Sequence, residues 1–253
     1  MARYQIILAY DGTGFNGLQR QTRGRTVQGE VESALRRLGW DGRSILSAGR
    51  TDAGVHASGQ VFALDYEWRH SPEDLQGALN ALLPPDVAVR DLQEAPPKFH
   101  PRYDALARRY AYRLFCQPLR DPLRERYAWR VWPPVKLKPL QQAARALKGS
   151  HDFAAFGSPL QKGGTTVRNV VRAEWEQAED AYTFHFEANA FLYHMVRRTV
   201  RLLVQVGQGR RPPKTVKDLL DRPQNGPVQG LAPAHGLELV EVRYPAQDET
   251  KES

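Results

Sequence analysis

Residues 47–57 read Ser-Ala-Gly-Arg-Thr-Asp-Ala-Gly-Val-His-Ala and connect two segments, residues 44–48 and 60–66, that have the character of β-strands. The glycines in this stretch allow a tight backbone turn, and Asp52 is its only acid. Such a loop can project a single carboxylate away from a sheet. An ordinary turn, in which Asp52 binds nearby amides and Arg50 faces solvent, explains the same spacing equally well.

The segments on either side of this loop predict a β-α-β-β-α-β order for the first hundred residues. Apolar residues recur at helical spacing behind Thr26, a suitable cap, and a second helix begins with the cap, proline and early acids of residues 71–74. We expect strands at residues 3–10, 44–48, 60–66 and 87–92, and helices that end at Gly39 and near Leu83.

The rest of the chain repeats that order, with expected strands at residues 108–115, 167–175, 182–187 and 237–242 and helices at residues 139–147 and 191–206. Prolines near residue 100 mark a junction, and residues 247–253 resemble a disordered polar tail. The sequence therefore predicts an α+β protein made of two ferredoxin-like halves, residues 1–100 and 101–246. These halves would form a mixed, mainly antiparallel sheet with helices on one face and a central cleft.

Positive charge is concentrated in two parts of the chain. Residues 101–150 hold twelve Lys or Arg against three acids, a net of +9, and residues 191–220 hold seven against one, a net of +6. Because the whole chain carries +8, the remaining residues carry −7. A solvated surface would mix the two signs, whereas segregated charge favours a polyanionic partner such as nucleic acid.

The composition excludes several other classes of protein. Cys116 is the only cysteine, so the chain can form neither an internal disulfide nor a cysteine-based zinc site. The sequence has no nucleotide-cofactor loop, and its seven histidines are not paired as metal ligands, so we expect no cofactor and no metal. Since no apolar run approaches the roughly 20 residues of a membrane span, a soluble, cytoplasmic protein is expected.

The full string of residues 47–57 resembles the signature of the tRNA pseudouridine synthase A family of pseudouridine synthases. Two departures from the family pattern are mild: Leu18 replaces a usual aromatic residue, and Tyr193 precedes His194 at a variable position. Five further motifs match family patterns in order, namely residues 10–17 with Gln19 and Gln21, residues 99–102, residues 109–112, residues 151–153 and residues 189–197.

The resemblance implies an isomerase that cleaves the N1 to C1′ bond of uridine, turns the bound uracil and joins its C5 to C1′. No cofactor is required, because the reaction has no net oxidation or reduction. Asp52 would be the nucleophile, attacking C1′ or uracil C6, or else a base that deprotonates C2′, and the sequence leaves these three routes open. The target uridine would be flipped out of its stack at a cost of roughly a few kcal/mol.

Three further site residues accompany Asp52 in this interpretation. Arg50 would hold the carboxylate ionised and oriented, and the resemblance implies that Arg197 pairs with Asp52 and that Tyr110 stacks on or bonds the flipped uracil. The other tyrosine of that strand, Tyr112, is expected in the core. A lone histidine is more often a hydrogen-bonded packing residue than a catalyst, which is our interpretation of His56 and His194.

The resemblance further implies that the substrate is tRNA, at uridines 38, 39 and 40 of the anticodon arm, and that the enzyme is a homodimer with no membrane association. Two other functions use the same features. One is a catalytically silent RNA-binding protein that needs only the basic surface. The other is an enzyme that removes or hydrolyses a flipped base.

Overall fold

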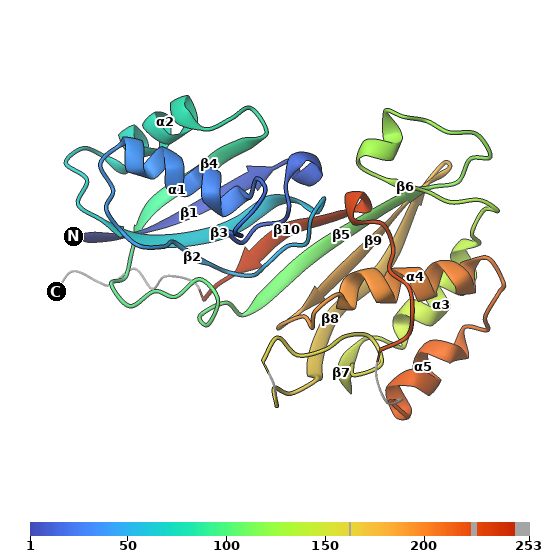
Figure 1. Ribbon diagram of the computed structural model, residues 1–253. Helices are drawn as coiled ribbons and strands as arrows, with labels where there is room; N and C mark the ends of the chain where they lie inside the picture. Colours follow the sequence, from blue (N-terminus) through green and yellow to red (C-terminus); the bar gives the residue numbers. More distant parts are fainter. Residues whose placement is uncertain (162, 224–226, 246–253) are drawn as a thin grey trace.

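The computed structural model describes residues 1–161, 163–223 and 227–245, and within these ranges the chain forms one ten-stranded sheet and five α-helices (Figure 1). The sheet is mixed and mainly antiparallel, because only two of its strand pairs are parallel. These observations confirm the predicted α+β class. The tail predicted at residues 247–253 lies outside the described residues.

The first part of the chain follows the predicted order of elements closely. Thr26 caps the first helix by accepting a hydrogen bond from Gly29 N, and Ser71 forms a capping box with Asp74 at the second. The two strands on either side of the Asp52 loop differ from their predicted bounds. The first covers only Leu46–Ser47 instead of residues 44–48, and the second covers His56–Tyr66 instead of residues 60–66. The elements are β1 (Ala2–Tyr10), α1 (Val27–Arg37), β2 (Leu46–Ser47), β3 (His56–Tyr66), α2 (Pro72–Leu82) and β4 (Val87–Ala95).

The second part contains the predicted strands and helices, together with two short strands, β6 and β7, and a short α-helix, α5, that were not predicted. The helix expected from residue 191 begins only at Met195, because His194 has a left-handed backbone with φ of 63°. The elements are β5 (Ala107–Phe115), β6 (Trp129–Arg130), α3 (Leu137–Arg145), β7 (Gly149–Asp152), β8 (Val167–Ala178), β9 (Ala181–Ala188), α4 (Met195–Gly207), α5 (Lys214–Asp221) and β10 (Leu237–Arg243).

The last strand of the chain lies in the middle of the sheet. The strand order is β4-β1-β3-β10-β5-β9-β8-β7, with β2 beside β3 and β6 beside β5. Figure 1 shows β10 in red between β3 and β5, where it pairs parallel with the former and antiparallel with the latter. Strand β10 therefore joins the part of the sheet built by residues 2–95 to the part built by residues 107–188. Division into separate domains at residue 100 stays a prediction.

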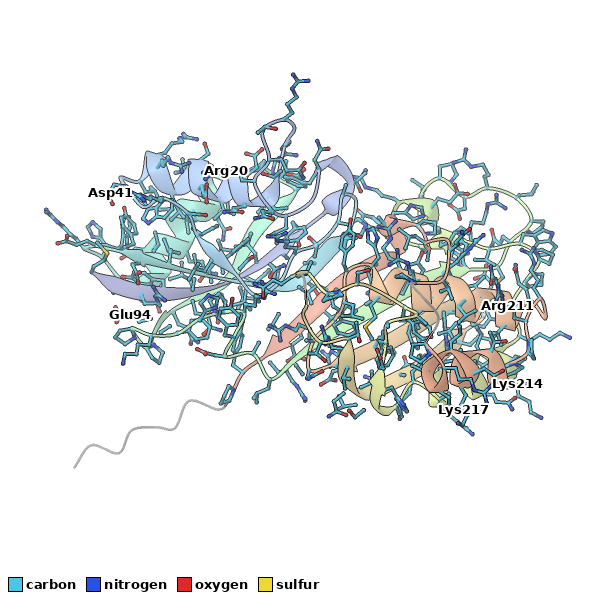
Figure 2. The ribbon with its side chains drawn as sticks, turned by 60° about the horizontal axis from the view of Figure 1, so that its bottom comes forward. Arg20, Asp41, Glu94, Arg211, Lys214 and Lys217 are labelled. Carbon is cyan, nitrogen blue, oxygen red and sulfur yellow. The ribbon has the colours of Figure 1, made fainter. Side chains whose placement is uncertain are left out.

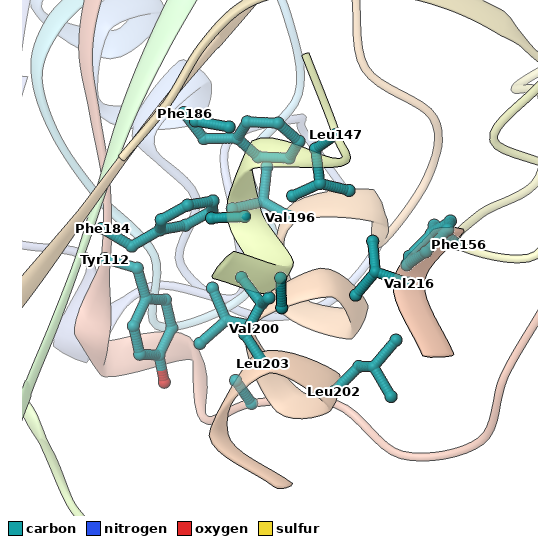
Figure 3. Packing of buried hydrophobic residues seen from close by; sticks show 14 of the residues in the cluster. Tyr112, Leu147, Phe156, Phe184, Phe186, Val196, Val200, Leu202, Leu203 and Val216 are labelled. Carbon is teal, nitrogen blue, oxygen red and sulfur yellow. The ribbon is translucent and has the colours of Figure 1, made fainter. Parts of the chain in front are cut away.

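Two hydrophobic clusters stabilise this sheet. One lies between α1, α2 and the strands β1, β3 and β4, and the other lies between α3, α4, α5 and the strands β5, β8 and β9. Figure 3 shows part of the second cluster, in which Tyr112 and Phe184 of the strands lie near Val200 and Leu203 of α4. Tyr110 packs against both clusters, so the two cores meet at β5.

Gly59 lies against β10, where the two parts of the sheet join. A Cβ atom at residue 59 would lie 2.2 Å from the carbonyl oxygen of Val240, which belongs to the backbone of a paired strand. We expect Gly59→Ala to lower the free energy of unfolding by about 2 kcal/mol, since overpacking typically costs about 1–3 kcal/mol. Urea unfolding measures this change.

The control for that experiment is Gly77→Ala in α2. A Cβ atom at residue 77 meets no atom within 4 Å. Alanine is favoured over glycine in a helix interior by about 1 kcal/mol, so this variant should be more stable than the unmodified protein. If Gly59→Ala were also stabilising, the close contact between β3 and β10 would be wrong.

Candidate active site

Asp52 lies in the loop between β2 and β3, and the start of the chain holds this loop in place. The Val55 N–H donates to the Asp52 carbonyl over 3.2 Å, which closes a turn directly before β3. On the other side of Asp52, the Thr51 carbonyl accepts from Leu18 N at 3.1 Å, and the Thr51 hydroxyl lies 2.7 Å from that of Tyr10. The aspartate is therefore fixed through its own carbonyl group and through the preceding residue, Thr51.

Gly12 belongs to the first family motif, residues 10–17, and its contacts show why a glycine is needed there. A Cβ atom at residue 12 would lie 2.1 Å from the carbonyl oxygen of Val55, so the first turn of the chain packs directly on the Asp52 loop. The Gly12 N–H donates to Nδ1 of His56 at 3.0 Å. Since Nδ1 accepts, Nε2 carries the proton and donates to the His235 carbonyl at 3.2 Å. Burial lowers the pKa of His56, and this neutral histidine has the expected packing role.

The carboxylate of Asp52 forms an ion pair with Arg197 from the first turn of α4. Nη1 of Arg197 lies 2.7 Å from Oδ2 of Asp52, and Nε of the same guanidinium donates to the Ala232 carbonyl at 2.8 Å. The two side chains are 27% and 15% exposed for Asp52 and Arg197, respectively, so water screens the pair only in part. Two hydrogen bonds from one planar group fix both the position and the orientation of the aspartate's partner.

His194 also approaches the aspartate. Its Nε2 lies 3.2 Å from Oδ2 of Asp52, and its ring stacks on Tyr193 with 3.6 Å between centroids. Burial lowers the pKa of His194 despite the nearby carboxylate, so the imidazole is mainly neutral at pH 7. Because the ion-pair contacts of Asp52 among the described residues go to Oδ2, Oδ1 is available to a ligand.

Tyr110 lies in the central part of the sheet, in β5 between β10 and β9. Its ring meets Phe191 edge to face with centroids 5.0 Å apart. Burial raises the pKa of Tyr110 well above its usual value, so the hydroxyl stays protonated. Tyr112, two residues along the strand, is fully buried and donates its hydroxyl to the Pro233 carbonyl at 2.9 Å. This contact agrees with the expected core position of Tyr112.

The four predicted site residues line one cleft with a volume of about 940 Å³, namely Arg50, Asp52, Tyr110 and Arg197. The structure differs from the sequence interpretation at Arg50. Its side chain is exposed, and the ion pairs of Asp52 among the described residues are with Arg197 and His194. Arg197, 145 residues away in sequence, forms the ion pair with Asp52 that the family resemblance implied, in the orienting position suggested for Arg50 from its proximity in the sequence.

The positive charge of the cleft comes only partly from the two basic segments, residues 101–150 and 191–220. Five arginines and a single carboxylate, that of Asp52, are found among the described residues of its lining. Of these arginines, Arg50 and Arg168 belong to neither basic segment. Much of the charge in those segments is instead neutralised locally: within residues 101–150, ion pairs hold Arg109, Arg113, Arg120, Arg124, Arg126 and Arg130.

The second basic segment is also partly neutralised. Figure 2 shows Arg211, Lys214 and Lys217 at the outer surface around α5. Within that helix, Lys214 pairs with Asp218 at 3.2 Å, and Lys217 pairs with Asp221. Counting charges along the sequence therefore overestimates the free positive charge here. The cleft, which collects cations from several separate elements, is the better candidate for a polyanion site.

Other reactive groups are few in the described part of the chain. In residues 1–161, 163–223 and 227–245, no three His, Cys, Asp or Glu side chains are grouped closely enough to hold a metal ion. None of the helices in these ranges has both the length and the apolar character that a bilayer span needs. Burial raises the pKa of the half-buried Cys116 thiol, which keeps it a weak nucleophile.

An aspartate held by an arginine at the centre of a basic cleft, on a mixed sheet with a central C-terminal strand, is consistent with a base-modifying enzyme. Comparison with protein families makes the class specific: residues 6–104 and 143–245 match the family model described as tRNA pseudouridine synthase. The matched ranges contain Asp52, Arg50 and Arg197, and Tyr110 lies between them. The chain belongs to the tRNA pseudouridine synthase family.

Curated relatives agree with the family model over nearly the whole chain. The chain is 42% identical to tRNA pseudouridine synthase A of Myxococcus xanthus, over 96% of this chain and 92% of that protein. It is 42% identical to the protein of the same name from Geobacillus kaustophilus, over 96% and 94%. It is 41% identical to tRNA pseudouridine synthase A of Syntrophotalea carbinolica, over 98% of each chain. The resemblance found in the sequence is thereby confirmed.

Proposed function

We propose that this protein converts uridine to pseudouridine in tRNA, at positions 38, 39 and 40 of the anticodon arm, with Asp52 as the nucleophile. The observation that carries the proposal is the charge arrangement of the cleft, in which one carboxylate lies among five arginines. The arginines suit the phosphates of an RNA strand. The carboxylate is the only anionic group among the described lining residues that can act on the sugar or the base.

The reaction needs no partner beyond the substrate. Asp52 attacks C1′ with departure of N1, or attacks uracil C6, or removes a proton from C2′, and each route leads to cleavage of the N1 to C1′ bond. The uracil then turns and its C5 bonds to C1′, while the bond from Asp52 to C1′ or C6 breaks or, on the third route, the proton returns to C2′. C5 loses its proton to solvent and N1 takes one up, which leaves Asp52 free. Atoms and electrons balance, since the product is an isomer of the substrate.

The neighbours of Asp52 have separate roles in this proposal. Arg197 holds Oδ2 of the carboxylate in an ion pair, so that Oδ1 is the oxygen that reacts. The protonated hydroxyl and ring of Tyr110 would contact the flipped uracil. Arg50, exposed at the cleft, would contact the RNA backbone.

Assembly as a homodimer is proposed on the family resemblance alone. A homodimer would let the basic surface of one subunit hold the body of the tRNA while the cleft of the other takes the uridine. Sedimentation of the purified protein with and without tRNA tests this assembly. A cytoplasmic location is proposed because the enzyme must meet its tRNA substrate.

The function is tested with tRNA labelled with tritium at C5 of its uridines. We expect the unmodified protein to release tritium, because C5 loses its hydrogen when it bonds to C1′, and to release no free uracil. A matched tRNA with cytidine at positions 38, 39 and 40 should release no tritium. Binding without release would indicate the silent RNA-binding protein, and free uracil would indicate base removal.

A further inference from the structure

The connection between β4 and β5 carries an exposed aromatic residue at the edge of the cleft. Tyr103 is 70% exposed, and it lines the same cleft as Asp52. The Tyr103 ring packs against the His100 ring, with 4.3 Å between the ring centroids and 39° between the ring planes. The guanidinium carbon of Arg102 lies 5.7 Å from the ring centroid. The ring is thus supported by two neighbours while most of its surface remains open.

The turn that carries Tyr103 is held by a network of hydrogen bonds. His100 Nδ1 accepts from the backbone N–H groups of Arg102 at 3.2 Å and Tyr103 at 3.4 Å. The His100 N–H donates to Oδ2 of Asp104 at 2.8 Å, and the Tyr244 hydroxyl donates to the Pro101 carbonyl at 2.6 Å. An exposed aromatic ring on an unconstrained loop would not indicate a binding site. Here the hydrogen bonds of the turn hold the Tyr103 ring in one orientation, at the edge of the cleft.

Arg108 connects that turn to the loop of the nucleophile. Its half-buried guanidinium forms hydrogen bonds with carbonyl groups rather than with a carboxylate, so its charge organises the backbone. One of these carbonyls lies at the start of the Asp52 loop, directly after β2, and another directly follows β9. The acceptors are the carbonyls of Ala48 at 3.2 Å, Arg102 at 2.5 Å, Ala105 at 3.3 Å and Asn189 at 2.8 Å.

The size and charge of the cleft indicate what this ring contacts. A volume of about 940 Å³ lies near the upper end of the ~300–1,000 Å³ typical of small-ligand pockets, which leaves space beyond one flipped uridine. Arg102 has no ion-pair partner among the described residues. A flat aromatic face beside such a cation suits a nucleobase with its phosphate, because bases stack on aromatic rings irrespective of sequence.

We propose that Tyr103 is a stacking platform for a nucleobase next to the flipped uridine, and that Arg102 binds the phosphate of that nucleotide. This inference rests on the proposed function, because it assigns a second nucleotide subsite to the same cleft. The platform keeps the RNA strand open after the uridine has left its stack. It thereby replaces part of the stacking that base flipping removes.

The test measures binding of tRNA to Tyr103→Leu in an Asp52→Asn background, where no reaction occurs. Loss of one stacked base should weaken binding about 5- to 150-fold, the range expected for base stacking on an aromatic residue. Tyr103→Trp should bind within about twofold of the parent, with quenched tryptophan emission. Trp132→Leu, which removes an exposed aromatic residue that does not line the cleft, is the matched control and should bind as the parent does.

A second series places one abasic nucleotide at each position beside the target uridine. At the position that stacks, the parent and the Tyr103→Leu variant should bind equally, because the base that distinguishes them is missing. The platform is wrong if Tyr103→Leu binds within twofold of the parent, if no abasic position removes the difference, or if sedimentation shows that the substitution changes oligomeric state instead.

The two proposals fail separately. If the unmodified protein releases no tritium while Tyr103→Leu still weakens binding, the isomerase proposal fails and the stacking platform stands. If tritium is released and binding does not depend on Tyr103, the platform alone fails. Thermal unfolding midpoints of Tyr103→Leu and Trp132→Leu, both exposed-site substitutions, show that either result comes from a folded protein.

Discussion

Asp52→Asn is expected to abolish pseudouridine formation, lowering kcat/KM by at least about 10⁴-fold, the scale seen when a catalytic nucleophile is lost. The amide has almost the shape of the carboxylate but lacks its charge and nucleophilicity, so tRNA binding should persist. Tritium release from C5-labelled tRNA measures the rate. A filter-binding titration measures the affinity separately.

Asp91→Asn is the matched control for this substitution. Asp91 is exposed in β4 and does not line the cleft, so its neutralisation makes the same change in net charge without touching the site. We expect both tritium release and binding to match the unmodified protein. If Asp52→Asn kept full tritium release, the assignment of Asp52 as the nucleophile would have to be abandoned.

Elements with strong local signals could be predicted from the sequence. The helix after Thr26 and the helix after Ser71 both begin where their caps predict, because capping depends on residues within one turn. Strands β5 and β9 also lie where their apolar alternation places them. Such signals are local, and they do not depend on what the rest of the chain does.

The elements that were missed depend on distant contacts. Strand β6 has only two residues and exists because it pairs with Leu114 and Phe115 of β5, a register that the local sequence does not encode. The late start of α4 reflects the left-handed backbone of His194, whose side chain approaches Asp52. Here a local helical pattern gives way to the geometry of the site.

The arrangement of the candidate site also depends on contacts between distant parts of the chain, so proximity in the sequence is a poor guide to it. The family motifs indicated Asp52 and its partner Arg197, whereas proximity along the chain suggested Arg50 as the orienting residue. Arg50, two residues away, is exposed, while Arg197 reaches the carboxylate because β10 and α4 bring distant segments together. Tyr103 was missed because its significance lies in exposure at the cleft, which the sequence does not report.

Arg197→Met is expected to lower kcat about 10²-fold or more, with a smaller change in KM. The substitution keeps the apolar stem but removes both hydrogen bonds of the guanidinium, to Oδ2 of Asp52 and to the Ala232 carbonyl. A carboxylate free to rotate spends little time in the reactive geometry, and a misplacement of about 1 Å can cost about 10²-fold in rate. Arg197→Lys should recover only part of the loss, because an ammonium group cannot make both contacts in one plane.

Arg201→Met, one turn further along α4 and outside the cleft lining, provides the control and should retain full kcat.

The double variant Asp52→Asn with Arg197→Met distinguishes positioning from a separate catalytic role. If Arg197 acts through Asp52, the double variant should be no slower than Asp52→Asn alone, because the group that Arg197 positions has already lost its function. A further drop of about 10-fold or more would show that Arg197 acts on the substrate directly. Full kcat in Arg197→Met would instead mean that the ion pair at 2.7 Å does not serve the reaction.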